Sequence, residues 1–186
     1  MISKGIKYFK SLIRIIFLKI RYGKRLKLKF NIRNLKSLYI GKNIDIKIAK
    51  HCQIRIGEGV YISDYCKFEC NNGEITIGND TYFNEGCKII CMEKIEIGKN
   101  CLFGPNVSIY DHDHKFDDKK VLINNQGFKT DKIIIKENIW IGTNCVATKG
   151  TVINERVVVG ANSLIKGNLI SNNLYAGSPV KIIKEI

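Results

Sequence analysis

The first 44 residues contain no acidic side chain, although they hold thirteen Lys or Arg residues. The rest of the chain is nearly neutral, with eighteen basic and seventeen acidic residues, so the formal net charge of +14 comes almost entirely from this N-terminal stretch. No nucleic-acid-recognition motif accompanies the charge, and the neutral body does not extend it. We therefore expect no nucleic-acid partner.

The basic stretch also lacks a long hydrophobic run. Its longest uncharged apolar run is Ile15–Leu18, far short of the roughly 20 residues that cross a bilayer. Lys10, Arg14 and Lys19 interrupt any signal-peptide core. Apolar residues interleave with the basic ones, which predicts a short amphipathic helix or helix pair.

Two interpretations of this N-terminal segment, residues 1–37, stay open. In the first, Ile6, Phe9, Ile13 and Phe17 cap the first coil of the folded body and the charges are solvated. In the second, residues 1–30 contact an anionic membrane face, where each nearby Lys or Arg adds about 1 kcal/mol.

Cysteine is abundant, but no C-x-x-C pair occurs. Pairing to a metal through Cys66 and Cys70, or Cys87 and Cys91, is disfavoured, and we expect no metal. The odd number and the absence of an export signal favour a reduced, cytoplasmic protein, located at the inner membrane face if the N-terminal segment binds there. The seven cysteines are Cys52, Cys66, Cys70, Cys87, Cys91, Cys101 and Cys145.

Helical periodicity is missing from most of the chain, and a period of six residues takes its place. Two inward positions per six residues leave room for a short face and a turn, and Gly, Asn and Asp supply the turns. Stacked units of this kind pair strand on strand at about 4.8 Å. The pattern predicts an all-β fold, a parallel β-solenoid over residues 38–186. From residue 135 the inward residues are Ile135, Ile141, Ala147, Ile153, Val159 and Ile165.

The six-residue repeat is interrupted once. Between Ile109 and Ile135 the chain uses 26 residues where one coil would use 18, which predicts an excursion loop at 115–132. His112 and His114 directly precede this loop in the sequence. If this stretch is extended, both imidazoles point to one side, while Asp111 and the next aspartate point to the other. Either acid could orient an imidazole.

Three motifs carry a family resemblance: the aliphatic-Gly-x-x-small repeat, the segment Asn138–Gly142, and the ending Ala176–Lys181. The chain resembles the hexapeptide-repeat acyltransferases, especially the maltose, galactoside and bacterial-polysaccharide O-acetyltransferases. The resemblance implies a left-handed β-helix, a homotrimer with active sites between subunits, acetyl-CoA as co-substrate and a sugar or polysaccharide-precursor acceptor.

The same resemblance assigns catalytic residues. His114 would be the general base that deprotonates the acceptor hydroxyl. His112 is the alternative base, and it would line the acceptor site with Tyr110. Asn84 would face the acceptor sugar, or it is a turn residue. Trp140 would wall the pocket from the adjacent subunit, or it serves trimer packing alone.

The resemblance also implies a site for coenzyme A. The backbone around Gly142 and Thr143 would donate to the developing oxyanion, with Gly142 allowing the ligand to approach closely. Coenzyme A would run past Ala161 towards Lys166 and Lys181. This sequence differs from the family's usual pattern at two places. Lys166-Gly167-Asn168 replaces a common Thr-Lys-Asp, and Lys181 replaces the arginine of many relatives.

Three other functions remain as alternatives. The first is N-acetylation of an amino sugar, or acylation of another small hydroxylated acceptor. The second is a zinc hydratase resembling γ-class carbonic anhydrase, which needs three histidine ligands. His51, His112 and His114 lack the expected spacing. The third is a non-enzymatic solenoid that binds polysaccharide.

Overall fold

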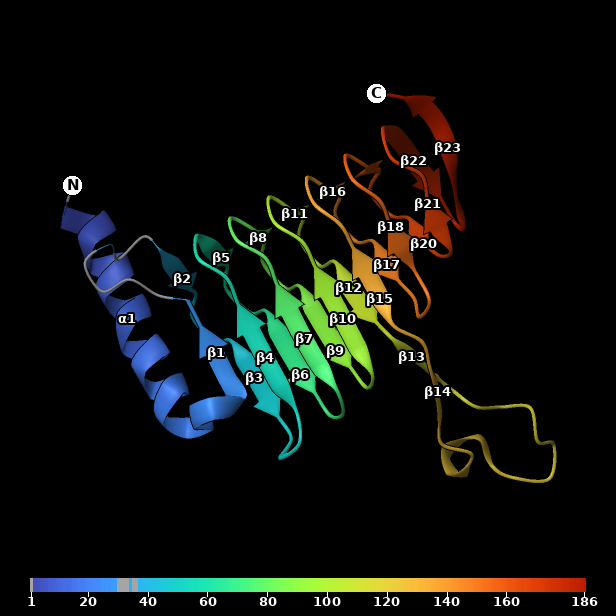
Figure 1. Cartoon of the computed structure of the whole chain (residues 1–186), viewed down its shortest axis with the longest axis horizontal. Helices are drawn as coiled ribbons and strands as arrows, with labels where there is room; N and C mark the ends of the chain where they lie inside the picture. The colour runs from blue at the N-terminus through green and yellow to red at the C-terminus, as the bar shows by residue number, and fades with distance from the viewer. Residues whose placement is uncertain (1, 30–33, 35–36) are drawn as a thin grey trace.

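The computed structural model describes residues 2–29, 34 and 37–186. Part of the expected N-terminal segment, residues 1, 30–33, 35 and 36, lies outside the described residues. The described residues form one α-helix followed by an elongated solenoid of parallel strands, with a single two-stranded ribbon projecting from it (Figure 1). This is a left-handed parallel β-helix, as the six-residue period and the resemblance predicted.

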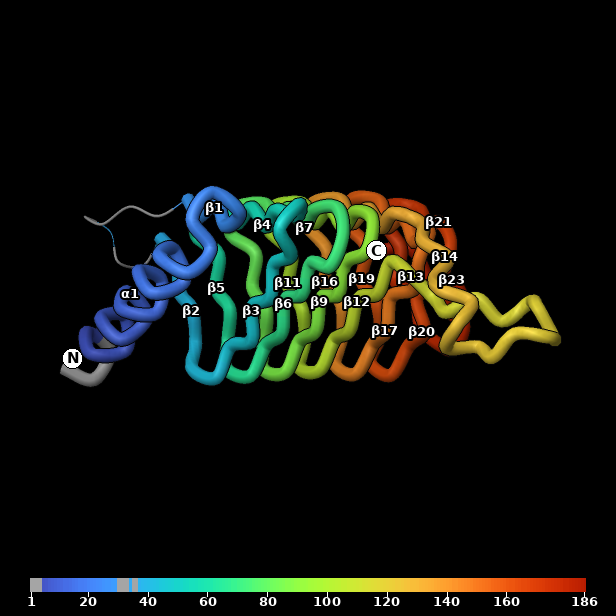
Figure 2. The backbone as a smooth tube through the Cα atoms, turned by 90° about the horizontal axis from the view of Figure 1, so that it is seen from below, coloured from blue at the N-terminus to red at the C-terminus, as the bar shows by residue number. Residues whose placement is uncertain are grey.

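Each complete coil contributes one strand to each of three sheets, in which neighbouring strands are parallel except for the final pair β22 and β23. Successive coils lie side by side along the long axis (Figure 2). Sheet A contains β1 (Leu26–Leu28), β4 (Gln53–Ile56), β7 (Glu74–Ile77), β10 (Lys94–Ile97), β15 (Ile133–Ile135), β18 (Val152–Ile153) and β21 (Asn168–Leu169). Sheet B contains β2 (Leu38–Ile40), β5 (Val60–Ile62), β8 (Tyr82–Phe83), β11 (Leu102–Phe103), β16 (Trp140–Ile141), β19 (Val158–Val159), β22 (Asn173–Gly177) and β23 (Val180–Glu185). Sheet C contains β3 (Asp45–Ile48), β6 (Lys67–Cys70), β9 (Lys88–Cys91), β12 (Ser108–Tyr110), β17 (Val146–Ala147) and β20 (Leu164–Ile165).

The core is the stack of inward side chains that the six-residue period predicted. Phe83 stacks on Phe103 with ring centroids 4.7 Å apart, and Phe68 packs edge-on against Phe83 at 5.3 Å. All seven cysteines are buried and unpaired, so they act as small core residues.

The corners between sheets are built by residues in the left-handed backbone conformation. At the corner between sheets B and C, Asn106, Asn144 and Asn162 all have φ near +57°. Their side chains form a ladder in which each amide donates to the next asparagine, at 3.2 Å per step. Asparagine suits this position because its short polar side chain tolerates positive φ and can bond locally.

Helix α1 (Ile2–Tyr22) leads through the 3-10 turn η1 (Gly23–Arg25) into β1, which pairs with β4. The first strand of sheet A therefore lies before the expected boundary at residue 38. The helix packs on β2, which confirms that it caps the first coil. The expected capping residues are wrong, however. Ile6, Phe9, Ile13 and Phe17 are all about half exposed or more, and the buried face consists of Ser11, Ile15 and Tyr22.

A glycine follows several inward isoleucines of sheet A because the next coil approaches too closely for a side chain. A Cβ atom on Gly78 would lie 2.5 Å from the carbonyl carbon of Gly98. The same atom on Gly98 would lie 2.5 Å from the carbonyl oxygen of Lys136. The neighbours are backbone atoms, so neither overlap can be relieved by a side-chain rotation.

We expect Gly78→Ala to lower the free energy of unfolding by about 1–3 kcal/mol, the usual cost of overpacking a fixed core. Denaturant unfolding measures the change. Gly5→Ala is the matched control, because its Cβ would meet nothing within 4 Å. Equal losses in the two variants would contradict the close approach of the coils.

Candidate active site

The excursion leaves the solenoid at the corner between sheets C and A and forms an antiparallel ribbon. Strand β13 (His112–His114) pairs with β14 (Phe128–Thr130), and the 3-10 turn η2 (Ile123–Asn125) lies in the loop between them. The Asp131 N–H donates to the Asp111 carbonyl at 2.9 Å and closes the neck of the ribbon. Both histidines therefore stand on the excursion itself rather than on the solenoid.

The two imidazoles lie on the same face of the ribbon, as alternation predicted. The Phe128 ring lies between them, with its centroid 5.5 Å from that of His112 and 4.5 Å from that of His114. Asp113 points away from them and forms an ion pair with Lys149 at 3.2 Å. Phe128 was not identified from the sequence, because no period governs the excursion.

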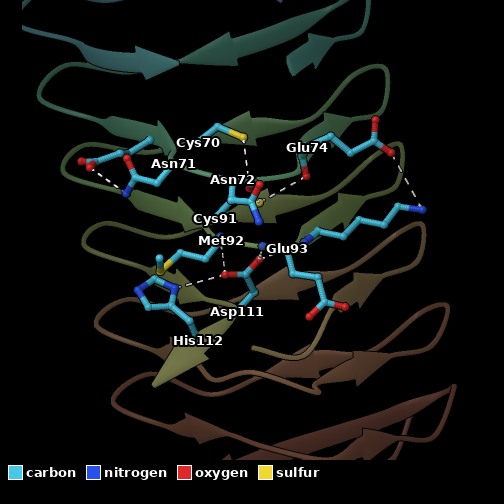
Figure 3. A network of polar contacts seen from close by, with 11 residues as sticks. Cys70, Asn71, Asn72, Glu74, Cys91, Met92, Glu93, Asp111 and His112 are labelled. Carbon is cyan, nitrogen blue, oxygen red and sulfur yellow. Dashed lines mark hydrogen bonds and ion pairs between the residues drawn. The ribbon is translucent and has the colours of Figure 1, made fainter. Parts of the chain in front are cut away.

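Asp111 is the acid that holds an imidazole. Its carboxylate is fully buried and accepts the N–H groups of Met92, Glu93 and Lys94 at 2.8–2.9 Å (Figure 3). It also lies 3.1 Å from Nδ1 of His112. A carboxylate can only accept, so neutral His112 carries its proton on Nδ1 and presents Nε2 as an acceptor. The question of which aspartate orients an imidazole is answered: Asp111 orients His112.

His114 is held differently. It is exposed, and its ring is tilted against Phe128. Among the residues that the structure describes, its imidazole has no hydrogen-bond partner. Within a single chain, Phe128 and the backbone of the ribbon therefore fix His114, and its ring nitrogens are open to a ligand or a neighbouring subunit.

Asn84, Thr143 and Ala161 line the corner between sheets B and C. Asn84 is half-buried, and its side-chain oxygen accepts the Glu85 N–H at 2.8 Å, which is the turn role. Its amide nitrogen has no partner among the described residues. Ala161 is exposed.

The backbone near Thr143 offers one donor, not two. The Gly142 N–H donates to the Val159 carbonyl at 2.8 Å and so belongs to the coil ladder. A Cβ on Gly142 would lie 2.7 Å from the Ala161 nitrogen, so coil packing rather than ligand approach accounts for this glycine. The Thr143 N–H has no acceptor in the described part of the chain.

Trp140 belongs to an apolar column on the outer face of sheet B. It is 55% exposed and lies between Leu102 and Val158 in the strand register. Leu102, itself 51% exposed, continues the column to Tyr82 on the preceding coil. Large apolar side chains aligned on one outer face are typical of an interaction surface.

The remaining expected residues lie apart from one another. Tyr110 ends β12, and its ring centroid is 6.3 Å from that of His112. Lys166 is exposed at the C–A corner, the same edge as the ribbon. Lys181 is exposed in β23, opposite Ala176. One chain therefore does not bring Lys166 together with Ala161.

The two halves of the expected site lie on opposite edges of sheet C. The histidine ribbon follows β12 at the C–A corner, whereas Asn84, Thr143 and Ala161 precede strands of sheet C at the B–C corner. A single chain cannot join these two edges. The edges can meet only if the B–C edge of one solenoid faces the C–A edge of another.

All seven cysteine side chains are buried away from solvent. Burial raises the pKa of Cys52 and of Cys101 to about 11, so both stay protonated at neutral pH. Each of the seven side chains is at most 3% exposed. Among the described residues, no group of three or more His, Cys, Asp or Glu side chains is arranged to hold a metal ion.

No family model matches the chain. It is 30% identical to the galactoside O-acetyltransferase of Escherichia coli over 139 residues, which is 75% of this chain and 67% of that protein. It is 32% identical to the putative lipopolysaccharide biosynthesis O-acetyl transferase WbbJ of E. coli, over 61% of each chain. The chain belongs to the hexapeptide-repeat acetyltransferase family. It spans only about half to three fifths of the length of several curated relatives.

Solved structures of this hexapeptide-repeat family match the solenoid. A maltose O-acetyltransferase from Clostridium difficile superposes with a TM-score of 0.58 and 26% identity, over 96% of this chain and 88% of that one. The N-acyltransferase AntD from Bacillus cereus, as a mutant bound to dTDP-4-amino-4,6-dideoxyglucose and coenzyme A, gives 0.63 and 28%, over 78% and 81%.

Asp111→Asn should lower the free energy of unfolding of this family member by about 1–3 kcal/mol, because an amide cannot accept all three N–H groups that the carboxylate accepts. Denaturant unfolding at neutral pH measures it. Asp113→Asn is the matched control, because its ion pair with Lys149 is half exposed and such pairs contribute about 1 kcal/mol or less. If both variants lose the same stability, Asp111 does not anchor the ribbon.

Proposed function

We propose that the protein is an acetyl-CoA-dependent O-acetyltransferase that modifies a hydroxyl group of a sugar or of a surface-polysaccharide precursor. The observation that carries the proposal is the histidine ribbon, which leaves the repeat on a solenoid whose relatives include sugar O-acetyltransferases. The structures of AntD and of other family members contain coenzyme A or acetyl-CoA, which supports the same acyl donor here.

In this mechanism His114 accepts the acceptor's hydroxyl proton while the hydroxyl oxygen attacks the thioester carbonyl. The Thr143 N–H of the adjacent subunit donates to the oxyanion. His114 then returns the proton to the departing thiolate. Direct transfer is supported because all seven cysteines are buried, where a substrate does not reach their thiols.

Asp111 and His112 act as the support of this base. The buried Asp111 carboxylate fixes His112. His112 and His114 both contact Phe128, so Asp111 and His112 together position the ribbon that carries His114. Tyr110 and the Nε2 atom of His112 then line the acceptor site beside the base. In this proposal the acceptor lies along the ribbon rather than along the solenoid face.

The assembly in this proposal is a homotrimer with active sites between subunits. Asn84 would contact the acceptor sugar, and Trp140 would wall the pocket from the neighbouring subunit. Coenzyme A would lie past Ala161 in the groove between subunits, with its phosphates near Lys166 and Lys181. Seven unpaired cysteines favour a reducing compartment, where acetyl-CoA is also available.

The second candidate is N-acylation of an amino sugar carried on a nucleotide. The structural likeness to AntD, which was solved with dTDP-4-amino-4,6-dideoxyglucose, favours it. Release of the coenzyme A thiol, measured across a panel of nucleotide sugars, amino-sugar nucleotides and capsule oligosaccharides, separates the two. Turnover only with amino sugars would reject the O-acetyltransferase assignment.

His114→Ala should lower turnover in that thiol-release assay by roughly 10²–10⁴-fold, the range for losing a general base. Acetyl-CoA should still raise the melting temperature of the variant, because the base does not bind the donor. His112→Ala should lose far less activity. The reverse order would make His112 the base, and two unimpaired variants would reject acyl transfer by this ribbon.

Subunits that supply different edges of the site should complement one another. We expect His114→Ala and Asn84→Ala subunits, each nearly inactive alone, to regain activity when they are refolded together in equal amounts. About one quarter of the sites in such a cyclic assembly would combine an intact His114 edge with an intact Asn84 edge. Sedimentation velocity checks the trimer. Absent recovery, or a stable active monomer, would exclude an interfacial site.

A further inference from the structure

One face of helix α1 packs against the first coil and covers the end of the solenoid. Ser11 accepts the Ile40 N–H at 2.8 Å, and Arg14 donates to the Ile40 carbonyl at 3.0 Å. The Tyr22 hydroxyl donates to the Ile46 carbonyl, and Ile15 is buried in the core. These contacts fix the rotation of the helix about its own axis, so its opposite face is equally fixed.

That opposite face is apolar from Ile6 to Ile20. At about 100° per residue, Ile20 lies on the side of the helix opposite to Ser11, nine residues earlier. Six large side chains gather there, and their exposed fractions run from 49% to 79%. About half or more of each side chain is therefore open to solvent. They are Ile6, Phe9, Ile13, Ile16, Phe17 and Ile20.

Basic side chains border this face. Lys10 and Arg21 lie along one side of it and Lys19 along the other, and all three are exposed. No acidic residue occurs before Asp45 to neutralise them. A second copy of the helix would bring an equally basic border against this one, so like charges oppose self-association. An apolar strip with cationic borders is instead complementary to hydrocarbon beneath anionic headgroups.

We propose that the outward face of α1 docks flat on an anionic phospholipid bilayer surface and so holds the enzyme at a membrane. The inference is independent of the acyl-transfer proposal, because no residue of α1 belongs to the candidate site. Within the described residues no helix combines the length and the apolar character needed to cross a bilayer, so the docking mode is interfacial.

The test is co-sedimentation of the full chain with phosphatidylcholine vesicles that contain or lack about one quarter phosphatidylglycerol. We expect binding to the anionic vesicles only. Binding should fall steeply from 0.1 M to 1 M salt, as the screening length shortens from about 10 Å to about 3 Å. Equal binding to both vesicle types, or binding to neither, would overturn the proposal.

Two sets of variants locate the surface. Ile13→Ser with Phe17→Ser should lower vesicle binding at least about tenfold, because two inserted apolar side chains are lost. Leu122→Ser with Ile123→Ser is the matched control, since it removes comparably exposed apolar side chains from the excursion loop. Lys10→Gln with Arg21→Gln should also lower binding about tenfold. Lys119→Gln with Lys120→Gln should leave it unchanged.

The remaining outcomes are equally decisive. Outward substitutions should leave the melting temperature and acetyl transfer to a soluble acceptor unchanged, which separates a failure of docking from a failure of the enzyme proposal. Unchanged vesicle binding by the Ile13 and Phe17 variant would overturn docking through α1. A further outcome would also reject the membrane. If the parent protein binds no vesicles, and the Ile13 and Phe17 variant forms a smaller assembly than the parent in sedimentation without lipid, this face contacts a second copy of the chain.

Discussion

Main-chain hydrogen bonding from coil to coil is the constraint on which the rest of this molecule depends. Strands in neighbouring coils must lie about 4.8 Å apart, so each residue sits directly over its equivalent in the next coil. That spacing leaves no room for a Cβ at Gly78 or Gly98. It also places Asn106, Asn144 and Asn162 in one ladder at the corner. An insertion of one residue within a strand would turn its inward side chains outward, so inserted residues must leave at a corner.

The excursion leaves the coil-to-coil pairing intact, and its neck is anchored to the preceding coil. Its neck is closed by Asp131 and Asp111, and β15 then pairs with β10 as though the insertion were absent. Asp111 uses its buried carboxylate to hold three backbone N–H groups of the preceding coil and one imidazole of the ribbon. These contacts fix the neck of the excursion to the solenoid.

The ends of the solenoid present the opposite problem, because a terminal coil has unpaired strand edges and an exposed core. At the C-terminal end β23 folds back on β22 in antiparallel register. At the N-terminal end α1 covers the first coil with a narrow face. Helix α1 therefore covers the core of the first coil with one face and exposes a second apolar face to solvent.

The sequence alone determined the solenoid, its inward residues and the position of the excursion, because all three follow from a period that local chemistry repeats. It also placed both imidazoles on one side of an extended segment, since alternation along a strand is a local property. It failed where contacts join distant residues. The pairing of Asp111 with His112, the contact of Phe128 with both histidines, and the coil ladder that occupies the Gly142 N–H all depend on neighbours fixed by folding. The same holds for α1: its sequence is apolar on two sides, and only packing against Ile40 and Ile46 decided which side is buried.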